Sequence, residues 1–231
     1  MLAKGSMPVV AFPVAALLLS LLLLPWNLYL ALPVIIICAA LTVIVVNFFR
    51  DPDRETGEGV VSPADGVLNR ADLSDSGAYF SIFMNIHDVH VNRAPWPGRV
   101  VEVVRMSGGH RPAYEKGAAK NERVRITIAG SLGSITVTQM VGILARRILP
   151  YVGAGRTLKK GERIGIIRLG SRVDLYVPST DLKLVARKGD RVLAGTTSLA
   201  IVTTKGGRVE GGKGGRDGRT GKGDDEGGDE K

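Results

Sequence analysis

The sequence predicts a β-dominated α+β domain with a two-helix membrane hairpin in front of it, and two patterns support this fold class. Two long apolar runs without a charged residue fill most of the first fifty positions. From residue 60 to residue 204 the chain instead consists of short β-rich runs separated by Gly, Pro, Asn and Asp. Several of these runs alternate apolar and polar residues at period two, and helical periodicity is poor, which favours strands.

The two apolar runs cover residues 8–25 and 28–46. Each is close to the roughly 20 residues that a helix needs to cross a bilayer. Pro25-Trp26-Asn27 separates them, so the simplest interpretation is a hairpin with both ends on one side, and Lys4 and Arg50 place those ends in the cytoplasm. The alternatives are a signal peptide, which would need a basic leader and a small-residue cleavage site before the second run, and a soluble core hairpin, which is rarely so long and uncharged.

Seven runs in the middle of the chain are the expected strands. They are residues 79–86, 99–105, 123–128, 134–141, 164–167, 173–177 and 198–203. The Gly-rich, charged segment 205–231 has Val209 as its one large apolar residue and is predicted to be a disordered tail. The predicted organisation is therefore a hairpin over residues 1–50, a folded domain over residues 51–204, and the tail.

The net charge of +9 is concentrated in the folded domain. The first fifty residues contribute two positive charges and the tail is neutral, so the remaining +7 falls on the middle of the chain. A basic domain suits nucleic acid or an anionic membrane surface. Aromatic residues make up only 5% and the neighbouring segment is a membrane anchor, so the lipid surface is favoured and no nucleic-acid partner is expected. The single cysteine, Cys38, provides no disulfide framework, which suits a reducing compartment.

The segment Leu169-Gly170-Ser171-Arg172 has two interpretations. A Gly inside a strand-like run is typical of a β-bulge or of a close backbone approach. A strained Gly-Ser peptide can also rearrange, because the Ser hydroxyl can attack the preceding carbonyl to give an ester, and elimination then leaves an electrophilic pyruvoyl group. Leu132-Gly133-Ser134 repeats the tripeptide, so the local sequence leaves the choice open.

Three polar groups precede this segment. Ser62-Pro63-Ala64-Asp65-Gly66 is a turn by composition, in which Asp65 has either a structural or a catalytic role. His87 and His90 lie three residues apart and are candidates for acid–base chemistry, for a metal pair, or for ordinary structural histidines. The polar loop from Gly109 to Arg123 is suited either to an anionic headgroup or to solvent.

Seven strings between residues 47 and 202 match one protein family in order. They are Phe48-Phe49-Arg50-Asp51-Pro52, Ser62-Pro63-Ala64-Asp65-Gly66, His87-Asp88-Val89-His90-Val91-Asn92-Arg93-Ala94-Pro95, Asn121-Glu122-Arg123, Val141-Gly142-x-x-Ala145-Arg146-Arg147-Ile148, Gly161-Glu162-Arg163-x-Gly165 and Gly170-Ser171-Arg172-Val173-Asp174. Together they resemble the short, Gly-Ser-Arg branch of the phosphatidylserine decarboxylase proenzyme family, which also shows two N-terminal membrane segments. Longer members have Thr where this chain has Arg172. An archaetidylserine decarboxylase is similar in the same strings, because its substrate has the same headgroup.

The resemblance implies self-cleavage between Gly170 and Ser171, and not at Gly133-Ser134. It implies two chains, residues 1–170 and 171–231, that remain together as a heterodimer and could oligomerise further. The cofactor would be a pyruvoyl group derived from Ser171, and no metal is implied. The enzyme would sit in the cell membrane with its catalytic domain on the cytoplasmic side.

The same resemblance implies the roles of four side chains. Ser171 would be activated by His90 as general base, with Asp65 orienting the histidine. The substrate amine would form a Schiff base with the pyruvoyl group, and His87 would protonate the α-carbon after carbon dioxide leaves. Phosphatidylserine, or an archaeal ether-linked analogue, would become the ethanolamine lipid.

Two other functions compete with this interpretation. One is a non-enzymatic, membrane-anchored β module, because residues 160–202 are similar to the strands and turns of lipoyl and biotinyl modules. That similarity also predicts a barrel-sandwich character for the domain around the Gly-Ser bond. The other is a metal-dependent lipid hydrolase that uses His87 and His90.

Overall fold

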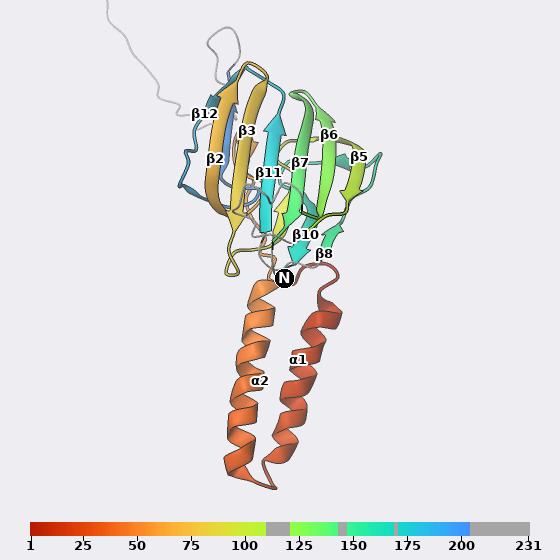
Figure 1. Ribbon diagram of the computed structural model, residues 1–231, viewed down its shortest axis with the longest axis vertical. Coiled ribbons are helices and arrows are strands. Elements are labelled where there is room, and N and C mark those ends of the chain that lie inside the picture. Colours follow the sequence, from red (N-terminus) through yellow and green to blue (C-terminus); the bar gives the residue numbers. More distant parts are fainter. Residues whose placement is uncertain (110–120, 143–146, 169–170, 204–231) are drawn as a thin grey trace, which may run out of the picture.

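The computed structural model describes residues 1–109, 121–142, 147–168 and 171–203. These residues form a β-dominated domain from which two helices project side by side (Figure 1). Gly170, residues 110–113 of the polar loop and the predicted tail lie outside the described residues.

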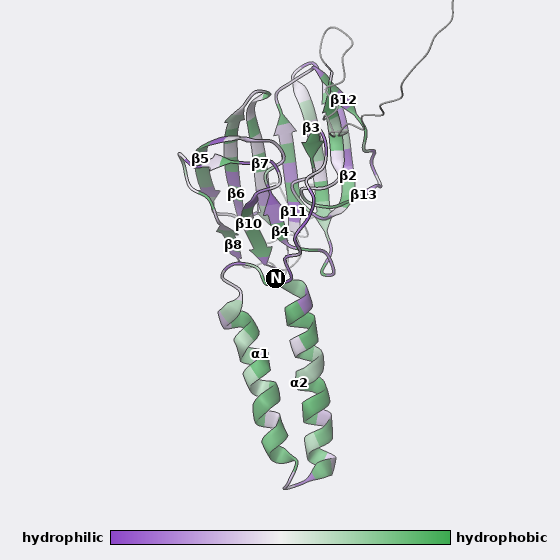
Figure 2. Cartoon of the chain, turned by 180° about the vertical axis from the view of Figure 1, so that it is seen from behind, coloured by the Kyte–Doolittle hydropathy of each residue, from purple (hydrophilic) through white to green (hydrophobic). Residues whose placement is uncertain are grey.

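The two helices follow the apolar runs of the sequence. Helix α1 (Met7–Ser20) continues into the short 3-10 helix η1 (Leu21–Leu23), and α2 (Leu28–Phe48) follows after a tight turn. The Asn27 side chain caps α2 by accepting hydrogen bonds from the backbone N–H groups of Tyr29 and Leu30, at 3.0 and 3.2 Å. Apolar residues predominate along both helices, as the side seen in Figure 2 shows. By length and composition α2 could cross a membrane, whereas the apolar stretch Met7–Leu23 is shorter.

The described part of the chain contains the following strands. They are β1 (Val60–Val61), β2 (Gly66–Ser74), β3 (Gly77–Met84), β4 (Val91–Arg93), β5 (Gly98–Met106), β6 (Arg123–Gly130), β7 (Gly133–Val141), β8 (Arg147–Pro150), β9 (Thr157–Leu158), β10 (Arg163–Arg168), β11 (Ser171–Val177), β12 (Leu182–Leu184), β13 (Arg191–Val192) and β14 (Ser198–Val202). The seven predicted strands are confirmed as β3, β5, β6, β7, β10, β11 and β14. The nine-residue strand β2 was not predicted, because most of it is exposed and polar and shows no apolar alternation.

The strands form one curled sheet of eight and two sheets of three. The order in the large sheet is β13-β2-β3-β11-β7-β6-β5-β9, and the smaller sheets are β1-β14-β12 and β4-β10-β8. Alternation along β6 buries Val124, Ile126 and Ile128 and leaves Arg125 exposed, as expected for a sheet with one covered face. The buried face contributes to one apolar core, which includes residues from β3, β7, β10, β11 and β14.

Strand β11 lies between β3 and β7, and it starts at the end of the large sheet that faces the helices (Figure 1). Its first residue, Ser171, is in register with Met84 at the end of β3 and with Val141 at the end of β7. The fold therefore brings the predicted cleavage position to the junction between the sheet and the helices.

Short contacts join the helices to the domain at this junction. Nη2 of Arg50, just after α2, donates to the carbonyl of His87 at 2.7 Å, and the Tyr151 hydroxyl donates to the carbonyl of Lys4 at 2.8 Å. A second apolar cluster spans the junction and joins Phe48 and Phe49 to residues of the domain such as Val91. The two helices are therefore packed against the domain and are not attached by a flexible linker.

Gly66 is required at the start of β2. Its φ is 145°, and an added Cβ would lie 2.1 Å from the carbonyl oxygen of Phe83. Gly189 also has a positive φ, 98°, but an added Cβ there would meet nothing within 4 Å.

We expect Gly66→Ala to lower the free energy of unfolding by about 2–4 kcal/mol, because backbone strain and a steric clash add together. Gly189→Ala, which adds the strain alone, should cost about 1 kcal/mol. Thermal unfolding of the two purified variants in detergent measures the difference, and equal Tm values would contradict the proposed close approach of β2 to β3.

Candidate active site

Ser171 is fully buried at the start of β11. Every second residue of β11 faces the core, and Ser171 belongs to this set together with Val173, Leu175 and Val177. The Ser171 hydroxyl lies 3.2 Å from Sδ of Met84, to which it donates a hydrogen bond. Sulfur is a weak acceptor, so this contact holds the hydroxyl without strong competition for its proton.

The second Gly-Ser of the chain has a different environment. Gly133 and Ser134 lie at the start of β7, just after the turn that joins β6 to β7, and both are exposed. Solvent competes for the Ser134 hydroxyl, whereas burial removes this competition at Ser171. Burial is therefore the structural feature that separates two identical tripeptides.

A buried polar network lies next to Ser171. Nδ2 of Asn92 lies 3.8 Å from Sδ of Met84, and Nε2 of Gln139 donates to Oδ1 of Asn92 at 2.6 Å. Met84, Asn92 and Gln139 are all fully buried, and the neighbouring Met140 is 3% exposed. Within the described residues Oε1 of Gln139 has no hydrogen-bond partner. A buried, unpaired acceptor is costly, which makes this network a candidate for contact with a reacting group.

The sequence analysis assigned no role to these residues. Asn92 belongs to one of the family strings, but Gln139 occupies an ordinary buried position of an alternating strand. A buried amide in an otherwise apolar strand face was the one signal that could have identified Gln139.

His90 is fully buried, and its ring is covered by the last residue of α2. The ring centroids of His90 and Phe48 are 4.2 Å apart, with an interplanar angle of 35°. Nδ1 lies 2.8 Å from the carbonyl oxygen of Asp88, which can only accept, so Nδ1 carries the proton and Nε2 keeps its lone pair. Among the described residues no group bonds to Nε2.

Burial lowers the pKa of His90 to about 4, because the charged imidazolium would lose its hydration. The negative charges of Asp88 and Asp65 act in the opposite direction, and the positive charge of Arg50 adds to the lowering. His90 is therefore neutral near pH 7 and is a proton acceptor. Its backbone carbonyl accepts from the N–H of Ile167 at 3.2 Å, which ties His90 to the strand that leads to Ser171.

Asp65 does not orient His90 through a hydrogen bond in this structure. Its carboxylate accepts from both terminal nitrogens of Arg54, one of them at 2.7 Å, and from the N–H of Ala194 at 2.8 Å. The carbonyl of Asp88 occupies the orienting position at Nδ1 instead. Asp65 acts on His90 through its charge alone, and no hydrogen bond among the described residues joins His90 to Ser171.

His87 is exposed at the edge of a cavity of about 360 Å³. The cavity lies between the domain-facing ends of α1 and α2, the loop after β3, and Arg168 at the end of β10. Its walls are mostly apolar, and its one cationic side chain is Arg168. Nη2 of Arg168 donates to the carbonyl of Gly5 at 3.1 Å, while its buried Nε has no partner within the described ranges.

The described residues contain no group of three or more His, Cys, Asp and Glu side chains placed to hold a metal ion. His87 and His90 also differ in environment, since the first is exposed and the second is buried against Phe48.

The buried Ser171 and the buried, neutral His90 both lie in the part of the domain that meets the two apolar helices. The comparisons with known proteins identify the family. A family model described as phosphatidylserine decarboxylase matches residues 41–200. This chain belongs to the phosphatidylserine decarboxylase family, so the resemblance seen in the seven strings is confirmed.

Individual relatives match over most of their length. An archaetidylserine decarboxylase proenzyme, so named, of Halobacterium salinarum is 44% identical over 201 residues, which cover 85% of this chain and 95% of the relative. A protein with the same name from Methanosarcina mazei is 45% identical over 166 residues, 71% of this chain and 77% of the relative. The phosphatidylserine decarboxylase proenzyme of Thermobifida fusca is 44% identical over 172 residues, 74% of this chain and 77% of the relative.

Replacing Phe48 tests the origin of the low pKa of His90. We expect Phe48→Ala to raise this pKa from about 4 toward the ordinary value of about 6.5, because the variant admits water to the ring. Phe48→Leu, which keeps an apolar cover, should leave the pKa low. Isotope-edited NMR of the chain's three histidines measures it.

Phe49→Ala is the matched control, because it removes the neighbouring ring, whose centroid lies 5.0 Å from that of Phe48, and leaves the Phe48 ring in place. A titration of His90 that is unchanged in Phe48→Ala would show that the Phe48 ring does not keep the site dry.

Proposed function

We propose that this chain is a self-processing, pyruvoyl-dependent decarboxylase that converts a serine phospholipid to the ethanolamine lipid. The substrate is phosphatidylserine or its ether-linked archaeal counterpart, archaetidylserine. Membership of the family and the proenzyme names of the relatives support this activity. They favour it over a metal-dependent hydrolase and over a non-enzymatic module. The observation that carries the assignment to Ser171 is its complete burial, in contrast to the exposed Ser134.

Processing begins when the Ser171 oxygen attacks the carbonyl carbon of Gly170. The peptide C–N bond breaks as an ester C–O bond forms, and the hydroxyl proton passes by way of Nε2 of His90 to the nitrogen of Ser171, which becomes a free amine. Elimination then releases the carboxylate of Gly170, and hydrolysis with loss of ammonia leaves a pyruvoyl group at residue 171. The unpaired Nε2 of His90 and the neutral state of the ring near pH 7 support its role as the proton acceptor.

The residues around Ser171 fit a small, uncharged carbonyl group. Ser171 is buried next to Met84 and the amides of Asn92 and Gln139, so the surroundings are dry and offer fixed dipoles. When formed, a pyruvoyl group supplies a ketone that condenses with a primary amine and takes up the electrons released with carbon dioxide. The poorly solvated surroundings of Ser171 favour loss of the substrate carboxylate. His87, in the lining of the neighbouring cavity, would return a proton to the α-carbon.

The lipid reaches this site through the 360 Å³ cavity between the helix ends and the domain. Apolar side chains of α1 and α2 would contact the lipid chains, while Arg168 would bind the phosphate near Ser171. The unpaired Nε of Arg168 supports this role, because a buried guanidinium N–H needs an acceptor.

The proposed organisation has three parts. Residues 1–50 form a membrane hairpin whose ends lie in the cytoplasm, residues 51–204 form the decarboxylase domain, and residues 205–231 form a tail. Processing would give chains 1–170 and 171–231, which share the large sheet because β11 is paired on both sides. The distribution of β10–β14 over all three sheets supports a barrel-sandwich arrangement around the cleavage site.

Ser171→Ala should leave the chain intact and inactive, because no hydroxyl attacks Gly170. Ser134→Ala is the matched control and should be cleaved as the parent is. Denaturing electrophoresis after purification separates the outcomes, and two fragments from Ser171→Ala would refute the assignment of the cleavage site.

Arg168→Gln should be cleaved but should raise KM for the lipid substrate by about 10- to 100-fold, because one charged hydrogen-bond donor to the phosphate is lost. Arg187→Gln, at an exposed position of the loop after β12, is the control and should not change KM. Decarboxylation in mixed micelles measures KM, and an unchanged value in Arg168→Gln would remove this residue from the substrate site.

A further inference from the structure

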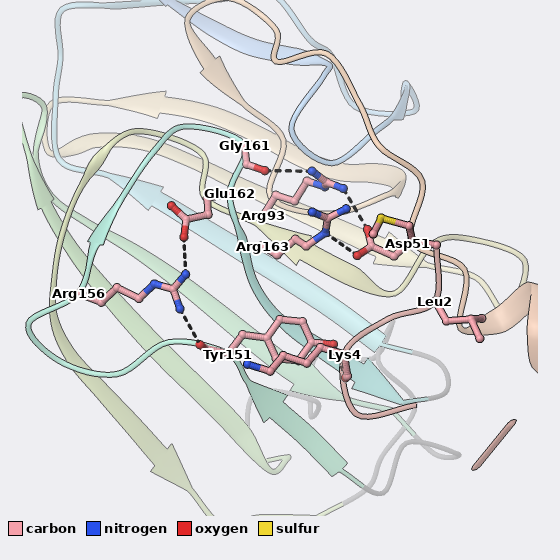
Figure 3. A pocket seen from close by; sticks show the side chains of 10 residues that line it. Leu2, Lys4, Asp51, Arg93, Tyr151, Arg156, Gly161, Glu162 and Arg163 are labelled. Atoms are coloured by element: carbon pink, nitrogen blue, oxygen red, sulfur yellow. Dashed lines mark hydrogen bonds and ion pairs between the residues drawn. The ribbon is translucent and has the colours of Figure 1, made fainter. Parts of the chain in front are cut away.

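A second cavity, of about 420 Å³, is lined in part by the N-terminal segment (Figure 3). Its walls come from residues before α1, from Asp51 just after α2, from Arg93 on β4, and from the turns on either side of β9. The cavity therefore lies where the chain passes between the helices and the domain. If the helices span a membrane as proposed, this is the level of the lipid headgroups.

The lining of this cavity has an excess of positive charge. Its described lining residues include Lys4, Arg93, Arg156 and Arg163 against two carboxylates, Asp51 and Glu162. Asp53, which is outside the lining and exposed, also pairs with Nη2 of Arg163 at 2.9 Å and lowers the excess to one positive charge. Asp51 is shielded, because Arg93 and Arg163 hold it at 3.0 and 2.5 Å and its side chain is only 5% exposed. An anion in the cavity would therefore meet guanidinium groups before it met the Asp51 carboxylate.

Several donors in the cavity remain available. The side chains of Arg156 and Arg163 are 47% and 36% exposed, so part of each guanidinium faces the cavity or solvent. Within the described part of the chain no hydrogen bond or ion pair involves the ammonium of Lys4, an exposed residue. These groups can bind an anion while Arg156 keeps its ion pair with Glu162 at 2.5 Å.

The N-terminal segment contacts the linings of both cavities. Tyr151, which lines the second cavity, donates to the carbonyl of Lys4, and Arg168, which lines the proposed substrate cavity, donates to the carbonyl of Gly5. The two cavities share no lining residue. Tyr151, Lys4 and the ion pairs of this wall are visible together in Figure 3.

We propose that the cavity around Lys4, Arg156 and Arg163 binds the phosphate group of an anionic lipid that is not the substrate. This inference rests on the proposed function for the position of the membrane. Arginine and lysine at a membrane surface are the side chains that recognise lipid phosphate. A lipid bound there would also restrain the N-terminal segment, which contacts the linings of both cavities.

The test uses the full chain in detergent and native mass spectrometry. The probes are phosphatidylglycerol, which is anionic, and phosphatidylcholine, which is zwitterionic. We expect selective retention of one phosphatidylglycerol molecule. The double variant Lys4→Gln/Arg156→Gln should bind it about 30-fold more weakly, since two charges are lost.

Two control variants separate charge from folding. Lys4→Arg/Arg156→Lys keeps both charges and should retain the lipid, and Arg187→Gln/Lys188→Gln removes two exposed charges elsewhere and should bind as the parent does. Equal retention of the two lipids, or equal binding by the Lys4→Gln/Arg156→Gln variant and the parent, would overturn the proposal.

Inorganic phosphate distinguishes the two sources of the ligand. Displacement of the lipid by millimolar phosphate would show that the site recognises the phosphate group from either source, whereas retention would show that a lipid is its ligand. The same spectra report chain masses. An intact chain that retains the lipid would contradict the proposed processing but support this site. A cleaved chain without lipid selectivity would support the proposed processing but contradict this site.

Discussion

The contact between Phe48 and His90 is the interaction on which the account of the site depends. It joins the last turn of α2 to the histidine that acts as the proposed base. It also excludes water from the imidazole, which keeps the pKa of His90 low and the ring neutral. Helix α2 therefore belongs to the proposed site, because its Phe48 ring covers the proposed base.

Burial has the same role at Ser171. A serine hydroxyl is a weak nucleophile, and in solvent water would compete both for its proton and for the ester that it forms. Placing Ser171 at the start of a central strand, next to Met84 and the Asn92–Gln139 pair, removes that competition. The cost of burying these amides is offset in part by the hydrogen bond between them, and among the described residues Oε1 of Gln139 has no partner.

The sequence predicted the apolar helices and, within the described residues, seven of the eight strands that have five or more residues, because apolar runs or alternation mark these elements. It did not predict β2, whose residues are mostly exposed and which is held mainly by pairing with β3. The family strings identified Ser171, His90 and Asp65 as candidates, but not their partners. Arg54 as the partner of Asp65, and the Asp88 carbonyl as the partner of His90, depend on tertiary contacts that a linear pattern does not contain.

The central claim is that Ser171 becomes the N-terminal group of a new chain. The most direct test is the intact mass of the purified protein, before and after treatment with a hydrazide that reacts with ketones. The account predicts two species, residues 1–170 and 171–231, with the hydrazide attached only to the second. A single uncleaved chain, or a break at Gly133, would contradict it.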